Sequence, residues 1–358
     1  MELFVGRYED LRSIIRILRD VVKGSKVLGY RVVGEGIGWG EISDINDLPL
    51  DFSDIQKPGF YRLSKGIRFR HSFVSPKLYL HPPEQLISLV LPNYRIVDYD
   101  LYIDKVILFG IKPCDLRAIS VLDSILGLNK HPIYTRMRSS IVGIVVEECL
   151  EPGETCFCGA VGAGPNVLQG FDIAYARFRE DLVLFKYGSD IGKEVISRAN
   201  LVKADRNIVS LYQEFIDRCR KTTETRIPNI NEIKNALKKS MNNTQLWSRL
   251  SSKCVGCGNC NYVCPTCFCI EIEDIVSDGL SKRIAKWIGC LTYTYGQVAG
   301  GHFRPRLYTR YRHFVLHKFL FYPMQINYIG CVGCGRCITW CPLGIDIRDT
   351  LREVVKNG

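Results

Sequence analysis

Cysteines are the residues of this sequence best suited to chemistry, and eight of the sixteen fall in two runs with the same spacing. The runs are "CVGCGNCNYVCP" at 254–265 and "CVGCGRCITWCP" at 331–342. Three cysteines at C-x2-C-x2-C bind one cubane, and a fourth that precedes proline typically binds the other cubane of a pair. The spacing therefore predicts two 4Fe-4S clusters that are held crosswise. Cluster 1 takes Cys254, Cys257, Cys260 and Cys341, and cluster 2 takes Cys331, Cys334, Cys337 and Cys264.

Zinc is the alternative metal for thiols that lie this close together. Structural zinc sites use two C-x2-C pairs in a tetrahedral array, whereas this sequence has two copies of a four-cysteine run that ends in Cys-Pro. The glycines between the cysteines permit tight bends that direct amide groups at sulfur. They are also compatible with ordinary turns. These glycines are Gly256, Gly258, Gly333 and Gly335.

Four cysteines in the first half of the chain form a second candidate group. Cys114 follows the apolar run "KVILFGIKP", Cys149 follows "SSIVGIVVEE", and "TCFC" contains Cys156 and Cys158. If the two runs are neighbouring parallel strands, their carboxyl ends share the sheet edge where ligands of α/β proteins bind. The four thiols would then hold a third iron–sulfur cluster. The alternatives are buried reduced thiols that act as small apolar groups, and a redox-active thiol pair.

The remaining cysteines are not needed as ligands. Cys267, Cys269 and Cys290 are interpreted as buried residues or as weak S–H donors to a nearby cluster. Cys219 shares a helical face with apolar residues and is predicted to lie in a core. The glycine-rich stretches "GEGIGWG" and "GAVGAGP" lack the strand and helix context of nucleotide-binding loops, so no flavin or nicotinamide site is predicted in this chain.

The elements that must position these cysteines change along the chain. Residues 1–20 predict an amphipathic helix, and 27–82 alternate in the manner of strands. A strand, helix, strand unit follows over 101–150, its helix opened by Asp115 as a cap, and 205–250 predict helices. The predicted fold is a mixed α+β or α/β domain over 1–245. A helical dicluster ferredoxin-like domain follows over 246–358, with a long insert between its motifs.

The insert comprises the 66 residues between Cys264 and Cys331. Its basic and aromatic composition suits a docking surface for a partner subunit, or a route for electrons toward a cluster. The plainer interpretation is a helix with one solvated face. Its apolar residues then pack inward, namely Val315, Leu316, Phe319 and Leu320. Lys253 and Arg336, which flank the cysteines, are expected to favour the more negative, reduced form of a cluster.

Composition excludes several classes of protein. The 358 residues carry a formal charge of +11, but Lys and Arg are scattered and no nucleic-acid motif is present, so no nucleic-acid partner is expected. No apolar run reaches the roughly 18 residues of a membrane span, and no leader pattern follows Met1. A cytoplasmic location, where cysteines stay reduced, is expected.

Several segments together resemble a family of 4Fe-4S dicluster proteins. The family includes the beta subunits of soluble NiFe hydrogenases, called sulfhydrogenases, and the dicluster component of anaerobic sulfite reductase. The segments are "FGIKPCDLRAISVLD", "EPGETCFCGAVGAGP", "CGNCNYVCPTCFC", "AGGHFRP" and "GCVGCGRCITWCPLGIDI". They span roughly 100–345, and the first hundred residues resemble the family more loosely. Gly159 and Ala160 depart from the family's usual Thr-Ser pair.

The resemblance implies an electron-transfer subunit of an anaerobic oxidoreductase complex. Its partners would be a subunit that binds flavin and NAD(P)H and a catalytic subunit that makes hydrogen or reduces sulfur compounds. The ligand role carries over to the eight cysteines of clusters 1 and 2. No residue of this chain is then expected to catalyse bond breaking. The alternative is a chain that itself reduces a sulfur compound at Cys114, or at Cys156 and Cys158.

Overall fold

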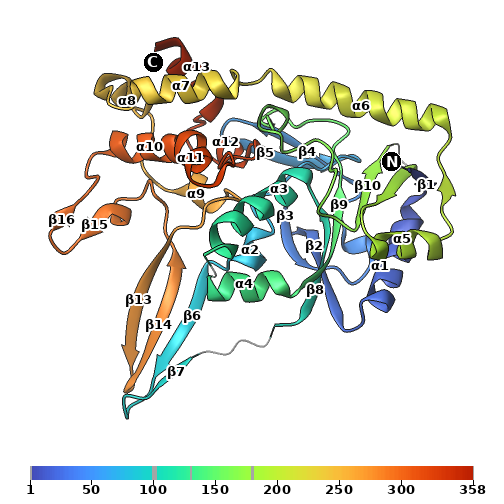
Figure 1. Cartoon of the computed structure of the whole chain (residues 1–358), viewed down its shortest axis with the longest axis horizontal. Coiled ribbons are helices and arrows are strands. Elements are labelled where there is room, and N and C mark those ends of the chain that lie inside the picture. Colours follow the sequence, from blue (N-terminus) through green and yellow to red (C-terminus); the bar gives the residue numbers. More distant parts are fainter. Residues whose placement is uncertain (1, 99–102, 130, 179–180, 358) are drawn as a thin grey trace.

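A computed structural model describes residues 2–98, 103–129, 131–178 and 181–357. Its largest element is a mixed sheet with the strand order β12-β1-β11-β10-β9-β8-β2-β3 (Figure 1). Strands β2, β8, β9 and β10 run parallel, and the outer pairs are antiparallel. The bounds are β1 Phe4–Gly6, β2 Ser25–Val33, β3 Gly36–Glu41, β8 Lys105–Ile111, β9 Ile141–Glu147, β10 Ile173–Arg177, β11 Val183–Tyr187 and β12 Val202–Lys203.

Helices cover both faces of this sheet. Helices α1 (Tyr8–Val21) and α5 (Asp190–Arg198) lie on one face, and α3 (Pro113–Leu122) and α4 (Pro132–Ser139) lie on the other. Successive residues of β8 alternate between the two cores, with Ile107 packing in the first and Leu108 in the second. Because both faces are covered, β8 and β9 are apolar except for Lys105 at the start of β8 and Glu147 at the end of β9.

The predicted strand, helix, strand unit is confirmed, with one correction. Strands β8 and β9 are parallel neighbours, with Leu108 opposite Ile144. Asp115 is not the N-cap of α3: Lys112 occupies that position, and Asp115 sits in the first turn, where its side chain accepts a hydrogen bond from the Lys112 amide. The first helix begins at Tyr8 rather than near Met1, because residues 4–6 form strand β1, which pairs with β11 and β12.

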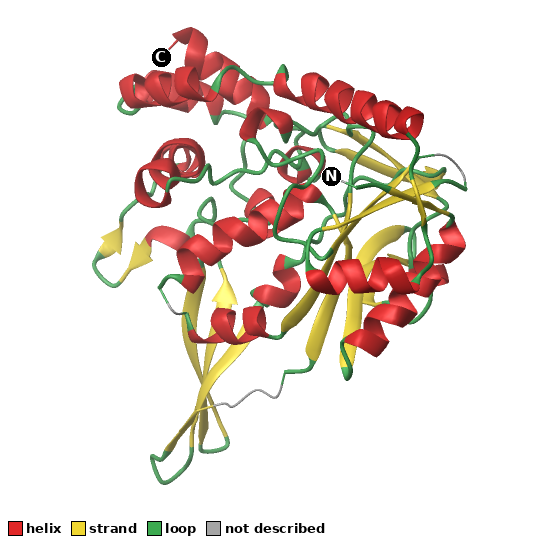
Figure 2. Ribbon diagram, turned by 45° about the vertical axis from the view of Figure 1, so that its right-hand side comes forward, coloured by secondary structure: helices red, strands yellow, loops and turns green. Residues whose placement is uncertain are grey.

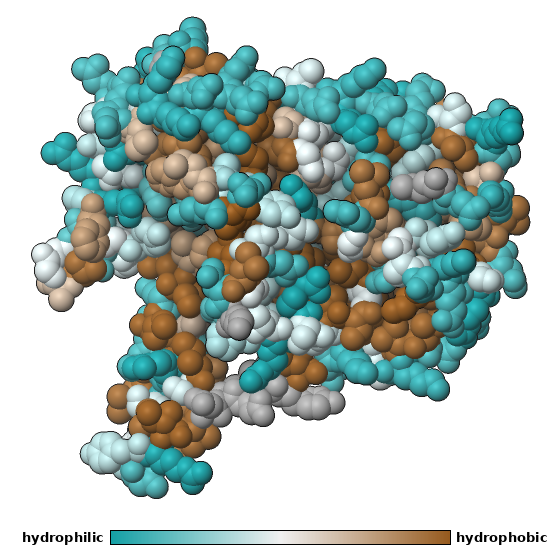
Figure 3. Space-filling model, in the orientation of Figure 1, coloured by the Kyte–Doolittle hydropathy of each residue, from teal (hydrophilic) through white to brown (hydrophobic). Residues whose placement is uncertain are grey.

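A second sheet joins the insert to the first half of the chain. Its order is β13-β14-β6-β7, and it projects from the body as an arm (Figures 1 and 2). The arm exposes apolar side chains such as Tyr94 and Val276, which are 89% and 74% exposed, and brown atoms gather on it in Figure 3. The bounds are β6 Glu84–Val90, β7 Ile96–Asp98, β13 Ile270–Ser277 and β14 Leu280–Trp287.

The longer helices that follow residue 229 pack over the cysteine loops. They share a core that contains Trp247, and the four insert residues predicted to pack inward are all buried in it. The preceding helix, over 206–224, packs in a separate core through Tyr212 and Ile216. Helix α7 lies against α13, so residues before and after the cysteine motifs are in contact. The bounds are α6 Arg206–Glu224, α7 Ile230–Ser240, α8 Thr244–Leu250, α10 Leu307–Leu316, a π-helical turn η5 His317–Phe321, α11 Tyr322–Ile326 and α13 Ile347–Asn357.

The remaining elements are short. They are η1 Ile45–Asp47, β4 Phe52–Lys57, β5 Phe60–Lys65, α2 Lys77–Leu80, η2 Asp123–Gly127, η3 Gly159–Val161, α9 Asn259–Tyr262, η4 Thr294–Gly296, β15 Gln297–Val298, β16 Gly301–His302 and α12 Arg336–Thr339. The "GEGIGWG" stretch forms the turn and second strand of the β2–β3 hairpin, as its composition predicts. None of the helices within the described ranges combines the length and apolar character needed to cross a membrane.

Candidate metal centres

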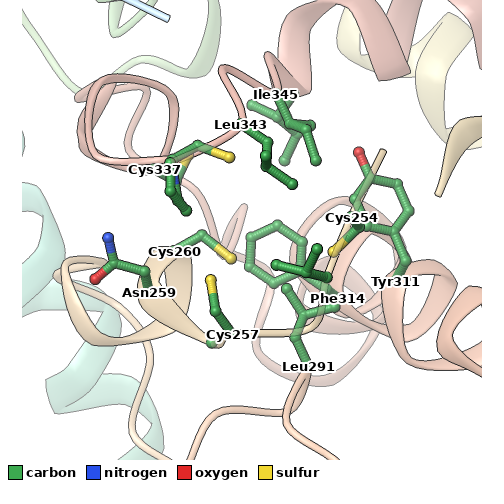
Figure 4. A pocket seen from close by; sticks show the side chains of 15 residues that line it. Cys254, Cys257, Asn259, Cys260, Leu291, Tyr311, Phe314, Cys337, Leu343 and Ile345 are labelled. Atoms are coloured by element: carbon green, nitrogen blue, oxygen red, sulfur yellow. The ribbon is translucent and has the colours of Figure 1, made fainter. Parts of the chain in front are cut away.

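The first cysteine motif and the end of the second line one cavity. In Figure 4 the side chains of Cys254, Cys257, Cys260 and Cys337 surround this space, with Leu343 and Ile345 on one side of it and Leu291 and Phe314 on another. Cys341 also lines the cavity, close enough to Cys254 and Cys260 for its charge to raise the pKa of both thiols. Five thiols therefore line this cavity, and four of them are the ligands predicted for cluster 1.

Glycines in left-handed conformations give the two motifs the same backbone path. Gly258 has a φ of 76° and precedes α9, and Gly335 has a φ of 80° and precedes α12. At the first bend of each motif, the amides of Gly256 and Gly333 donate to the Sγ atoms of Cys254 and Cys331, each at 3.4 Å. These donors would stabilise negative charge on sulfur, as a bound cluster requires.

The second set of thiols lies deeper. The four thiols predicted for cluster 2 lie close enough together for the charge of one to raise the pKa of another. They belong to Cys331, Cys334, Cys337 and Cys264. Cys264 and Cys334 are buried, whereas Cys257 of the first set is exposed. Because Cys337 also lines the first cavity, the two sets share a wall. In the described ranges, no three His, Cys, Asp or Glu side chains have the spacing to bind a single metal ion.

A buried lysine contacts the thiol that the first motif contributes to the second set. Lys318 Nζ donates to Cys264 Sγ at 3.1 Å. A hydrogen bond from Cys267 and the positive charge of Lys318 lower the pKa of Cys264 well below its ordinary value. Burial alone would lower the pKa of Lys318, but the charges of Cys264, Cys267 and two further neighbours together outweigh it and raise that pKa. The thiolate form that binds iron is therefore favoured at Cys264.

Arg336 is expected from the sequence to favour the reduced form of a cluster through its charge, but that charge is paired within the protein. The guanidinium is fully buried and lies 2.8 Å from Asp115 Oδ1, at the start of α3. It also donates to the Ser72 carbonyl at 2.8 Å and to the Tyr30 hydroxyl at 2.7 Å. The Asp115 carboxylate offsets its charge, and the ion pair ties the second motif to the N-terminal half of the chain.

The four N-terminal cysteines border another cavity at the carboxyl ends of β8 and β9, which is called the third cavity after the predicted third cluster. Burial raises the pKa of Cys149 to about 11 and that of Cys156 to about 12, so both are protonated thiols without a metal. Cys334 lines this cavity too, and its carbonyl accepts a weak hydrogen bond from Cys156 Sγ at 3.7 Å. The lining cysteines from the first 220 residues are Cys114, Cys149, Cys156, Cys158 and Cys219.

An unpartnered histidine also lines the third cavity. His71 is 1% exposed, and neither of its ring nitrogens has a hydrogen-bond partner. Burial holds its pKa well below the ordinary value, so the ring is neutral and has one free lone pair and one free N–H. Unpaired buried nitrogens are costly unless something else satisfies them. The residues around this cavity therefore fit a bound metal group.

Two of the three spare cysteines, Cys267 and Cys290, lie beside Asn261, and the third, Cys269, lies beside Tyr295. The Asn261 Nδ2 donates to Cys290 Sγ at 3.2 Å and to Cys267 Sγ at 3.7 Å. The Tyr295 hydroxyl donates to Cys269. All three thiols thus have partners within the chain, in agreement with a structural interpretation.

Three residues of these centres were not identified from the sequence. Lys318 and His71 are far in sequence from the cysteines they accompany, and no local motif marks them. Cys219 is 2% exposed, as a core residue should be, but it also borders the third cavity. Its position among apolar residues of α6 predicts burial but does not indicate that the thiol borders a cavity.

Two comparisons place the chain among known proteins. Residues 253–345 match the family model described as a 4Fe-4S dicluster domain. The chain is 31% identical over 335 residues to "Sulfhydrogenase 2 subunit beta" of Pyrococcus furiosus, and the match covers 88% of this chain and 87% of that protein. No solved structure matches.

The dicluster match defines the class of protein, an iron–sulfur protein that carries 4Fe-4S clusters. The identity and coverage are sufficient to assign the chain to the 4Fe-4S dicluster family that contains the sulfhydrogenase beta subunits. It is an electron-transfer protein with a mixed α/β region and a C-terminal dicluster ferredoxin-like region.

Proposed function

We propose that this chain relays electrons between two partner subunits of an oxidoreductase complex. One partner binds flavin and NAD(P)H, and the other is a NiFe hydrogenase or a sulfur- or sulfite-reducing subunit. The relationship to a sulfhydrogenase beta subunit supports this assignment. A bound 4Fe-4S cluster accepts and releases single electrons. The contribution of the protein is to hold such groups in line and to shield them from water.

The observation that carries the proposal is the continuity of the three thiol-lined sites. Cys257 opens the first site to solvent, Cys337 belongs to the wall between the first and second, and Cys334 lies between the second and third. The sites thus lead from the protein surface to the carboxyl edge of the large sheet. In this arrangement the crosswise ligand sets hold clusters 1 and 2.

The third site would hold a third iron–sulfur cluster. Its ligands would be Cys114, Cys149, Cys156 and Cys158, which all line one cavity. The neutral His71 ring and the buried Cys219 thiol also line this cavity. Because the thiols are protonated in the metal-free chain, assembly of this cluster would release protons.

A complex that carries Cys264→Ala tests the relay. Electron transfer from NAD(P)H to a dye at the flavin subunit should persist, and so should dye-driven turnover at the catalytic subunit. The coupled reaction from NAD(P)H to the terminal acceptor should be lost, because the middle site lacks a ligand. Lys253→Met, an exposed neighbour of Cys254, serves as the control and should keep all three rates.

Full coupled activity in the Cys264→Ala complex would contradict the relay. A different result would favour the chain as an enzyme in its own right: turnover of polysulfide by the isolated chain, with loss of that turnover on Cys156→Ser. Without the partner subunits, the relay predicts no such turnover.

A further inference from the structure

Lys318 is held in the protein interior by three hydrogen bonds. It is 4% exposed and lies in the π-helical turn η5. Besides the 3.1 Å contact with Cys264 Sγ, its Nζ donates to Thr266 Oγ1 and to the Gly330 carbonyl, each at 3.2 Å. An ammonium group has three donors, so this side chain is fully used and its position beside the thiol is fixed.

A second buried ammonium lies near the same thiols. Lys77 is 4% exposed, and its Nζ lies 3.2 Å from the Tyr262 carbonyl and 3.7 Å above the Trp287 ring. In the part of the chain that the structure describes, no carboxylate pairs with either lysine. Arg336 is the contrast, because Asp115 offsets its charge at 2.8 Å.

Two uncompensated cations favour negative charge between them. Burial of a charge without a counter-charge is costly, and attraction between charges is strong where water is excluded. The thiolate of Cys264 supplies part of the compensation. One-electron reduction of a cluster on this thiolate adds one negative charge beside Lys318, and the attraction to the ammonium then favours the reduced form.

We propose that Lys318 is a positioning residue that raises the reduction potential of cluster 2, with Lys77 as a weaker contributor. The electron comes from the donor partner, no covalent bond is made or broken, and Lys318 keeps its proton throughout. Electrons are thereby favoured at the buried centre beside the third cavity. This inference rests on the proposed ligand role of Cys264.

The test compares Lys318→Met with Lys318→Gln in the full chain, purified without oxygen. Glutamine keeps a hydrogen-bond donor but loses the charge, whereas methionine loses both. Iron content is measured first, and potentials are then read by redox titration with electron paramagnetic resonance. The cluster 2 signal is the one that Cys264→Ala removes. We expect wild-type iron content and a more negative midpoint of that signal in both variants.

Two further variants complete the design. Lys253→Met removes an exposed lysine of the first motif, next to Cys254, and should leave the cluster 2 midpoint unchanged, because solvent screens that charge from the buried second site. Lys77→Met should move the cluster 2 midpoint in the same direction by less. It also decides the question if the Lys318 variants lose iron.

Unchanged midpoints in the Lys318 variants would overturn the inference, and so would a shift in the methionine variant alone, which would identify the hydrogen bond as the cause. If the Lys318 variants lose iron, an unchanged midpoint in Lys77→Met would overturn it. These results differ from failure of the proposed function, which would appear as a wild-type chain without 4Fe-4S clusters.

Discussion

The two cysteine motifs have the same spacing and the same glycine bends but lie in different surroundings. The first motif is near the surface: Cys257 is exposed, and Val255 and Leu343 beside the cavity are 66% and 46% exposed. The second is covered, with Cys334 only 7% exposed and Arg336 in a fully buried ion pair. One local sequence pattern therefore makes both a surface-facing site and an interior site, and the packed neighbours decide which.

The largest effect is expected from removal of the cysteine that each motif contributes to the cluster of the other motif. Cys341→Ala should abolish the cluster of the first motif, and Cys264→Ala that of the second, because each run lends its last cysteine to the other. Each variant should lose about four irons per chain. Iron analysis and electron paramagnetic resonance measure the loss, and Lys253→Met is the control. If each variant lost the cluster of its own run, the crosswise assignment would be wrong.

The next effect concerns the ion pair that anchors only the second motif. Asp115→Asn leaves the Arg336 charge buried and unpaired, which should lower the free energy of unfolding by about 3–5 kcal/mol. The matched control is Asp274→Asn, which breaks the exposed pair with Arg283 and should cost about 0–1 kcal/mol. Urea unfolding followed by circular dichroism gives both values. Equal losses would show that the buried pair is no anchor.

A smaller effect should separate the equivalent glycines of the two motifs. Alanine at either position adopts an unfavourable left-handed conformation, at a cost of about 1 kcal/mol. A Cβ at Gly335 would also lie 2.7 Å from the Thr155 carbonyl oxygen, whereas one at Gly258 would meet a movable Thr292 methyl group at 2.8 Å. Gly335→Ala should therefore lower the unfolding midpoint in urea more than Gly258→Ala. The reverse order would contradict the tighter packing of the second motif.

Two strands of the large sheet and the bends of the cysteine motifs could be predicted, because apolar runs and cysteine spacing depend on residues close together in the sequence. The apolar runs at 105–111 and 141–147 are strands that both faces of the sheet bury, and their parallel pairing brings Cys114 and Cys149 to one edge. The bends at Gly258 and Gly335 follow from the spacing of the cysteines.

Contacts between distant segments could not be predicted in this way. Lys318 reaches Cys264 across 54 residues, and Arg336 pairs with Asp115 across 221 residues. The pairing of β14 with β6 joins the insert to the first half of the chain, although the sequence of neither strand indicates which strand it pairs with. Such contacts depend on tertiary packing, which a single sequence does not encode as a pattern.

Iron counting is the most direct test of three centres in a row. Iron, sulfide and electron spins per chain are measured on protein purified without oxygen, for the wild type and for Cys156→Ser. Three clusters give about twelve irons in the wild type, and loss of the third leaves about eight in the variant. About eight irons in both would contradict a cluster in the third cavity, and a colourless, iron-free wild type would contradict the relay itself.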